Sequence, residues 1–324
     1  MAKRFNNKLL IIILVVLTGI FFITRMINQK RSSGTLKTDL VQIDSSLINT
    51  ILLYPAAENG AEIIFNRNGN KWIAIKGDLS VEANMNGVQN MLSELVLLSP
   101  ERLVTRDRGQ WSDYGVDDSL GTRVIMKQGK KTVVDLMVGR FDYQPGPSGY
   151  GGYRGNYGSG LTYVRLSDEP EVYVVNGFLA MSFNQTFNNW RNQTFLNTNT
   201  SSLTSLKFEY PADSGFLILK VDTLWMIDDM QADSVFMVQY LNGIRRKSNN
   251  SFIDHFSPVI GPDYQLTIEG INMEPVVIKA YLTEENEFIL NSSQNPEVYF
   301  SSPPTGLFES IFKSKSEFLN QGGL

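Results

Sequence analysis

Two stretches of the chain begin alike: "SSLINTILLYPA" at Ser45–Ala56 and "SSLTSLKFEYPA" at Ser201–Ala212. In the second stretch, Leu206, Phe208 and Tyr210 alternate with polar residues, which is the period-two pattern of a strand with one buried face. The proline near the end of each stretch removes a backbone donor and predicts the end of the strand. The repeated opening therefore predicts that one structural unit occurs twice in the chain.

Three more landmarks recur in the same order after each opening. They are "KWIAI" around Trp72 and "LWMID" around Trp225, "NGV" at Asn86–Val88 and "NGI" at Asn242–Ile244, and "PEVY" at Pro170 and at Pro296. A collinear series of this kind predicts the duplication of a unit of about 110 to 150 residues.

Each copy has the sequence pattern of an α+β unit, a mostly antiparallel sheet with one principal helix. Asn68-Gly69 separates two β-rich runs and predicts a tight hairpin turn. Apolar residues at spacings of three and four predict one amphipathic helix in each copy: Met85, Val88, Leu92 and Leu95 in the first, and Val238, Leu241 and Ile244 in the second.

The first residues of the chain have the composition of a membrane segment. "LLIIILVVLTGIFFI", Leu9–Ile23, is uncharged and has basic residues on both sides. Its length suits either a short membrane span or the core of a signal peptide. The following "FFITRMINQK" lacks the small residues that a signal peptidase needs, so we expect an uncleaved N-terminal transmembrane helix. Because basic residues lie at both ends, their count does not decide the orientation, but the short tail before the span favours a single pass with the amino terminus inside.

The sequence thus divides into five expected parts. They are a membrane anchor at residues 1–31, a linker at 32–44, a first α+β repeat at 45–196, a second α+β repeat at 197–312 and a C-terminal tail at 313–324. In a bacterium, this arrangement places the chain in the inner membrane through residues 9–23, with its bulk in the periplasm. A lipoprotein anchor is excluded because the chain has no cysteine.

The body of the chain is acidic. From Ser32 onward it carries 23 Lys and Arg against 33 Asp and Glu, a net charge of −10. Phosphate backbones are bound through clustered basic side chains, and no basic stripe stands out in the sequence. We therefore expect no nucleic-acid partner.

Only the first copy contains the insertion "YQPGPSGYGGYRGNYGSG" at residues 143–160. One interpretation is a surface loop, because so much glycine makes ordering entropically costly. The other is a binding loop, since tyrosines on glycine spacers offer adaptable contact area. In that case the candidate partner contacts are Tyr143, Tyr150, Tyr153, Arg154 and Tyr157.

The sequence offers little for catalysis. Without cysteine there is no thiol nucleophile, and the single histidine, His255, stands between aromatic residues, where we expect a packed or hydrogen-bonded ring rather than a base. We predict no enzyme, no cofactor and no metal site. A pair of carboxylates that the fold brings together for glycoside hydrolysis remains open as an alternative.

Several segments resemble the bacterial domain-of-unknown-function family 4340. They are the anchor "FNNKLLIIILVVLTGIFFI", then "WIAI" at Trp72–Ile75, "SPERLVTRD" at Ser99–Asp107, "WSDYGVD" at Trp111–Asp117, "VVDLMVG" at Val133–Gly139 and "TYVRLSDEPEVYVV" at Thr162–Val175. The resemblance covers the anchor and most of the first copy, and it is weaker in the second. It implies a membrane-anchored extracytoplasmic protein, of a kind often encoded beside the permease and auxiliary subunits of ABC transporters associated with gliding motility. It implies no catalytic residues.

From these observations we expect a non-enzymatic periplasmic accessory protein, in which two repeats form an interaction platform for an ABC-type transport or gliding-like complex. The alternative is a glycan-binding protein or a carboxylate-based hydrolase of the cell envelope. A concave pocket with a cluster of perturbed carboxylates would favour the enzyme, and an exposed apolar or aromatic patch would favour the platform.

Overall fold

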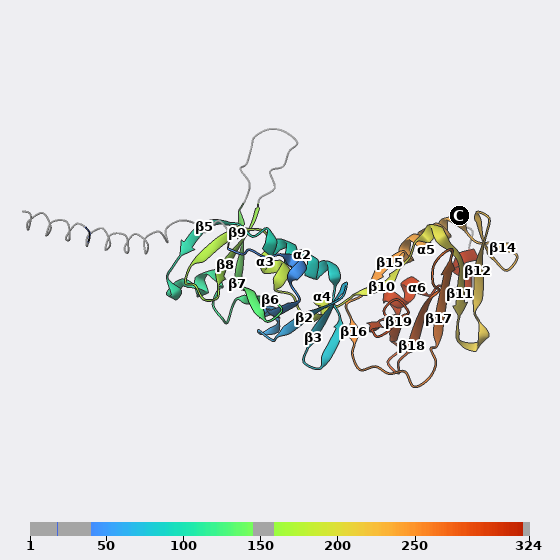
Figure 1. Ribbon diagram of the computed structural model, residues 1–324. Helices are drawn as coiled ribbons and strands as arrows, with labels where there is room; N and C mark the ends of the chain where they lie inside the picture. The colour runs from blue at the N-terminus through green and yellow to red at the C-terminus, as the bar shows by residue number, and fades with distance from the viewer. Residues whose placement is uncertain (1–17, 19–39, 145–158, 320–324) are drawn as a thin grey trace, which may run out of the picture. The chain divides into compact units, whose positions relative to one another are not determined.

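The computed structural model describes residue 18 and residues 40–144 and 159–319 (Figure 1). Apart from Thr18, the expected anchor at 1–31 lies outside the described residues, and so does most of the linker. Within the described part of the chain, none of the helices combines the length and the apolar character that a membrane crossing requires.

The chain forms two compact units. The first contains residues up to Ser80 and Met85–Thr186, and the second contains Val81–Asn84 and the residues from Phe187 onward. Residues 187–196, which the sequence pattern assigns to the first repeat, therefore belong to the second unit. Ala83 joins the second unit through a β-bridge to Arg191.

The first unit is built on a nine-stranded sheet (Figure 1). In spatial order, its strands are β4 (Leu79–Glu82), β3 (Lys71–Lys76), β2 (Ile63–Asn68), β1 (Thr50–Tyr54), β6 (Thr122–Gln128), β7 (Lys131–Gln144), β8 (Ser159–Leu166), β9 (Val172–Asn176) and β5 (Pro100–Thr105). The pairings from β3 to β5 are antiparallel. The predicted hairpin turn joins β2 to β3, and Gly69 there has a φ of +58°, which glycine adopts without strain.

A second nine-stranded antiparallel sheet forms the second unit. In spatial order, its strands are β14 (Met230–Gln231), β13 (Leu224–Ile227), β12 (Phe216–Val221), β11 (Leu203–Glu209), β17 (Tyr264–Gly270), β18 (Val276–Leu282), β19 (Phe288–Ser292), β20 (Tyr299–Ser302) and β16 (Phe252–Ile253). A separate two-stranded sheet pairs β10 (Thr194–Asn197) with β15 (Arg246–Ser248). The described part of the chain is thus a sheet-rich α+β protein.

The two large sheets have the same strand order. In each, the first four strands along the chain fill the fourth, third, second and first places, the next occupies the ninth place, and the last four fill the fifth to eighth. Trp72 and Trp225 are both the second residue of the strand in second place. Each pairs across the hairpin with a basic residue whose charge lies over its ring, Arg67 at 5.1 Å and Lys220 at 5.9 Å.

The repeated "SSL" opening forms the same local structure twice. Asp44 caps a short 3-10 helix, η2 (Ser45–Leu47), and its Oδ1 accepts a hydrogen bond from the Ser46 backbone N–H at 2.9 Å. Asn199 caps η6 (Thr200–Ser202) in the same way, through the Ser201 N–H at 3.3 Å. An Asx cap satisfies a backbone donor that the first turn leaves unpaired, so each cap fixes the point at which a strand begins.

One principal helix accompanies each sheet, as predicted. Helix α2 (Met85–Val96) buries Val88, Met91, Leu92 and Leu95. Helix α5 (Ser234–Ile244) buries Met237, Tyr240, Leu241 and Ile244, whereas Val238, predicted to face the sheet, is exposed. The prediction for Val238 was wrong because the buried stripe of α5 passes through its neighbour Met237 instead. Short helices complete the units: α3 (Leu179–Phe183), α4 (Phe187–Trp190), α6 (Glu309–Ile311) and α7 (Lys315–Leu319).

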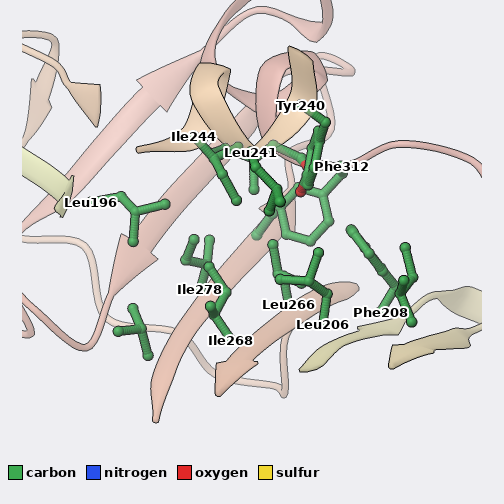
Figure 2. Packing of buried hydrophobic residues seen from close by; sticks show 14 of the residues in the cluster. Leu196, Leu206, Phe208, Tyr240, Leu241, Ile244, Leu266, Ile268, Ile278 and Phe312 are labelled. Atoms are coloured by element: carbon green, nitrogen blue, oxygen red, sulfur yellow. The ribbon is translucent and has the colours of Figure 1, made fainter. Parts of the chain in front are cut away.

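The core of the second unit lies between its sheet and these helices. Figure 2 shows Tyr240, Leu241 and Ile244 of α5 directed toward strand residues such as Leu206 and Leu266. Phe318 of α7 packs its ring against four other rings, among them those of Phe208 and Tyr240. Burial of this apolar surface is the main force that holds the helices on the sheet.

Candidate functional site: an apolar groove in the first unit

The loop between β5 and β6 covers one side of the first sheet and contains the "WSDYGVD" motif. It includes two 3-10 turns, η4 (Arg108–Gln110) and η5 (Ser112–Tyr114). Val116 of this loop is fully buried against Met137, Leu161 and other residues of β7, β8 and β9. The motif thus covers apolar residues of β7, β8 and β9. The alternating pattern of the strands alone does not predict this contact.

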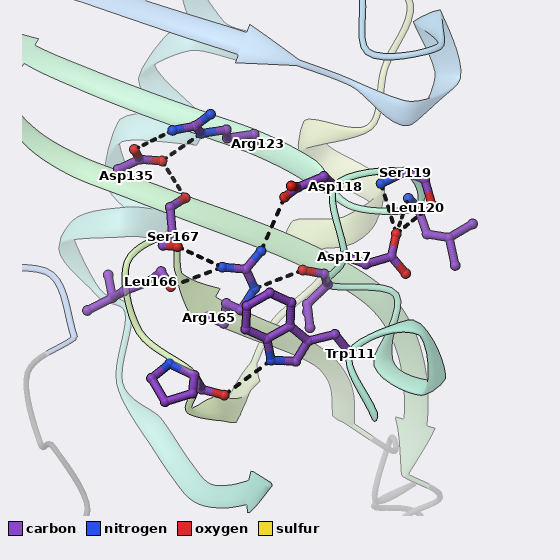
Figure 3. Close-up of polar contacts among 12 residues, drawn as sticks. Trp111, Asp117, Asp118, Ser119, Leu120, Arg123, Asp135, Arg165, Leu166 and Ser167 are labelled. Atoms are coloured by element: carbon purple, nitrogen blue, oxygen red, sulfur yellow. Dashed lines mark hydrogen bonds and ion pairs between the residues drawn. The ribbon is translucent and has the colours of Figure 1, made fainter. Parts of the chain in front are cut away.

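Arg165 of β8 is a buried charged residue beneath this loop, and only 2% of it is exposed. Its guanidinium carbon lies 3.7 Å from the centroid of the Trp111 ring, a cation–π contact. Its nitrogens donate to the carbonyl oxygens of Val116 and Ser167, each at 2.9 Å (Figure 3). The indole N–H of Trp111 donates to the Pro170 carbonyl at 3.2 Å. The buried charge is therefore satisfied mainly by backbone carbonyls.

The acidic residues of the motif also act locally. Oδ1 of Asp117 accepts hydrogen bonds from the backbone N–H groups of Ser119 and Leu120 at 2.8 and 2.9 Å. Asp118 approaches Arg165 only at 3.4 Å, and its side chain is 94% exposed. Asp117 thus helps to shape the loop, whereas Asp118 remains in solvent.

Two glycines let this loop approach the bulged strand β7. A Cβ on Gly139 would lie 2.3 Å from the Tyr114 carbonyl oxygen. Gly115 has a φ of +64° and lies against the backbone of Arg140. Glycine is required at both places because a side chain would clash at the first and strain the backbone at the second.

Beside this loop lies a groove of about 640 Å³. Its walls come from the loop, from β6 and β7, and from α3 with the residues that follow it. The main lining side chains are Asp113, Leu120, Arg140, Phe141, Met181 and Gln185.

Exposed apolar side chains surround the groove. Leu120 is 57% exposed and Met181 is 56% exposed. Phe178, just before α3, is half exposed and stacks on Phe141 with ring centroids 5.4 Å apart. Leu120, Phe141 and Met181 line the groove itself, and Phe178 and Tyr143 lie next to Phe141, through ring stacking and along β7. We call these five residues together the apolar groove. Clustered exposed apolar residues are typical of contact sites in soluble domains.

Of the predicted partner contacts, the structure describes one. Tyr143 lies near the end of β7 and is 55% exposed, two residues beyond Phe141 on the same side of the strand. Tyr150, Tyr153, Arg154 and Tyr157 lie outside the described residues. The described ends of the insertion pair with each other on β7 and β8, Tyr143 with Gly160 and Gln144 with Ser159.

Titratable groups in the first unit interact mostly with one another. A second groove, of about 530 Å³, contains Arg123 and Asp135. Burial alone would raise the pKa of Asp135, but hydrogen bonds from Arg123 and Ser167 and the charge of Arg123 lower it overall. Asp135 is thus held ionised, which suits a structural ion pair and not a general acid.

Glu94 of α2 differs from these paired acids. Burial raises its pKa, and Ser182 Oγ donates to its Oε1 at 2.9 Å. Its Oε2 is buried without a hydrogen-bond partner among the described residues. Glu94 does not line any of the grooves described here, so its raised pKa concerns the packing of α2 against α3.

His255 is exposed, with a φ of +63°. The expected packed ring was wrong: the histidine lies on a turn, and its neighbour Phe256 makes the aromatic contacts, with Tyr281 and Tyr299.

Sequence reasoning missed several residues of the apolar groove. Phe178 and Met181 lie at the start of a short helix with no clear period, and Leu120 lies in a turn. One signal was available: Phe141 lies directly before the insertion at 143–160.

The described residues form a sheet-rich α+β protein with two large antiparallel sheets, and the first unit has a groove with exposed apolar side chains. The family model described as "Domain of unknown function (DUF4340)" matches residues 72–258, more than half of the chain. The chain belongs to this family, as the motifs predicted. No curated protein and no solved structure matches it.

Proposed function

We propose that this protein is a non-enzymatic, membrane-anchored accessory protein of the bacterial cell envelope and that it binds a protein partner through the apolar groove. The observation that carries the proposal is the groove itself. Leu120, Phe141 and Met181 line it, and Leu120 and Met181 are more than half exposed. Half-exposed Phe178 extends this apolar surface by stacking on Phe141. Burial of such side chains against a partner contributes about 1.5–3 kcal/mol for each one fully covered.

The chemistry of the groove favours contact over catalysis. It contains one acidic and one basic side chain, Asp113 and Arg140. Arg140 lies over the ring of Tyr163 at 5.3 Å, so its charge is already engaged. Glycoside hydrolysis needs two carboxylates on either side of the scissile bond, and the lining of this groove includes one.

We also propose that the two units arose by duplication. The identical strand orders, the Asx-capped openings and the matched Trp72 and Trp225 support it. In this view the first unit gained its contact groove after duplication, because the insertion beside it has no counterpart in the second copy.

The anchor and the partner class are part of the same proposal. The apolar run at residues 9–23 would hold the chain in the inner membrane with both units in the periplasm. The family resemblance makes the permease or auxiliary subunits of an ABC-type complex the first partners to examine.

Crosslinking and purification from native membranes test this proposal. The full chain should recover ABC-type subunits, and Met181→Asp should reduce their recovery. Leu217→Asp is the matched control, since Leu217 is an exposed leucine on β12 of the second unit. Equal recovery with both variants would contradict the role of the groove, and recovery of no such subunit with the unmodified chain would contradict the partner class.

A glycan-binding function is the second candidate, and one observation favours it. A groove of about 550 Å³ in the second unit contains several amide and hydroxyl side chains: Asn197, Thr198, Asn199, Ser202, Asn272, Ser293 and Gln294. NMR titration of the protein with peptidoglycan fragments tests it: chemical-shift changes at these residues that reach saturation would support glycan binding. An unchanged spectrum would eliminate it.

A further inference from the structure

The loop at residues 254–263 occupies the same place in the second unit as the "WSDYGVD" loop in the first. Each joins the strand in ninth place to the strand in fifth place of its sheet. The loop of the first unit turns inward and buries Val116. The shorter loop of the second unit turns apolar residues outward.

The base of this loop is fixed at both ends. Asp254 forms a bidentate ion pair with buried Arg191, with nitrogen–oxygen distances of 2.8 and 3.1 Å. At the other end, the Asp263 N–H donates to the Ala280 carbonyl at 3.0 Å, and its carboxylate accepts from the Leu282 N–H at 2.8 Å.

The tip of the loop is apolar and fully presented to solvent. Val259 is 98% exposed and Ile260 is 75% exposed. Pro258 and Pro262 lie on either side, and proline reduces the conformational freedom that a binding loop loses when it binds. The tip would therefore lose little conformational entropy on inserting into a partner.

An acidic turn leaves the sheet at the same end as this loop. The β18–β19 turn, which contains Glu284, Glu285 and Glu287, leaves the sheet at the same end, because Asp263 binds both Ala280 and Leu282 of β18. Neither 254–263 nor 282–287 contains a lysine or arginine. The described residues thus place an aliphatic tip beside an acidic turn.

We propose that Val259 and Ile260 insert into an apolar pocket of a protein partner whose rim is basic. An anionic lipid surface is disfavoured because it would repel the acidic turn. A second copy of this chain is disfavoured because its body carries a net charge of −10. This surface lies in the second unit, so the proposal does not depend on the apolar groove of the first.

A photo-crosslinking residue at position 259 of the full chain, irradiated in native membranes, tests the proposal. We expect an adduct with another protein, and none from the matched position 217. The yield of this adduct should fall at least about fivefold in the triple variant Glu284→Lys/Glu285→Lys/Glu287→Lys, because the reversed charges would repel a basic rim. It should fall similarly in ~0.5 M salt, because salt screens exposed charge pairs. A charge reversal of basic residues at the pocket rim of the identified partner should restore the adduct to the triple variant.

Several results would overturn the proposal: an adduct with lipid, an adduct with a second copy of the chain, no adduct, or a protein adduct that charge reversal and salt leave unchanged. Thermal unfolding of each variant provides the control for folding. The Asp254→Asn variant adds an independent check. It releases one end of the loop without changing the tip, and should reduce the yield of the same adduct.

Discussion

Trp111 lies flat over the guanidinium of Arg165, with 3.7 Å between the charge centre and the ring centroid. The two residues come from different parts of the first unit, a loop and strand β8. Their contact holds the "WSDYGVD" loop against the sheet. The same loop provides one wall of the apolar groove.

Replacement of Arg165 by methionine should destabilise the protein by about 2–4 kcal/mol, because the carbonyls of Val116 and Ser167 would lose their buried donor. Asp118→Asn is the control and should cost less than about 0.5 kcal/mol, since its carboxylate is almost fully exposed. Urea unfolding of the full chain in detergent measures both. Equal effects of the two substitutions would contradict the backbone-centred account of Arg165.

Glu94→Gln should stabilise the protein at neutral pH by about 1 kcal/mol, because it removes a charge that burial disfavours. The raised pKa means that the folded state binds the proton more tightly than the unfolded state. The stability that the protonated Glu94 carboxyl contributes is fully present below its ordinary pKa of 4.5. It is lost as the pH rises through the pKa of the folded state.

The pH dependence of unfolding checks this sign. It should be recorded from about pH 3.5, roughly one unit below the ordinary pKa of 4.5, up to about pH 8. Glu297→Gln, at an exposed position, should leave the profile unchanged. A wild-type protein that gains stability through Glu94 as the pH rises would refute the assignment.

Two glycines should respond to alanine in opposite ways. Gly139→Ala should destabilise the protein by several kcal/mol, of the order expected for a severe overpacking clash, since its Cβ would meet the Tyr114 carbonyl. Gly243→Ala has open space around it and lies within α5, so it should stabilise by about 0.5–1 kcal/mol through helix propensity. Thermal unfolding of the pair compares them directly, and a neutral Gly139→Ala would show that the loop can move away from β7.

The predicted anchor can be tested at the amino terminus. Because the segment after Ile23 lacks a small-residue cleavage site, mass spectrometry of the mature protein should find the original terminus. A new terminus between Met26 and Leu40 would identify a cleaved signal peptide instead. Protease added to spheroplasts should digest the body of the chain, and protection from it would contradict the expected orientation.

The sequence by itself determined the fold class, the family and the two principal helices, because these depend on local periodicity and on motifs that remain visible in a linear chain. It also located the equivalent strands of Trp72 and Trp225. The sequence was a poorer guide to which side of a helix faces the sheet, as Val238 shows. Helix α5 has apolar residues around most of its surface, so its sequence does not reveal which stripe the sheet covers.

Only the tertiary structure decided where the surfaces of contact lie. Leu120, Phe141 and the pair Phe178 and Met181 come from three separate segments, and no periodic pattern in the sequence links the three. Val259 and Ile260 form an apolar pair of a kind that is often buried, and here both lie exposed in the loop at residues 254–263. Such juxtapositions depend on long-range strand pairing and on the space each loop must cross, and neither quantity is encoded in a local pattern.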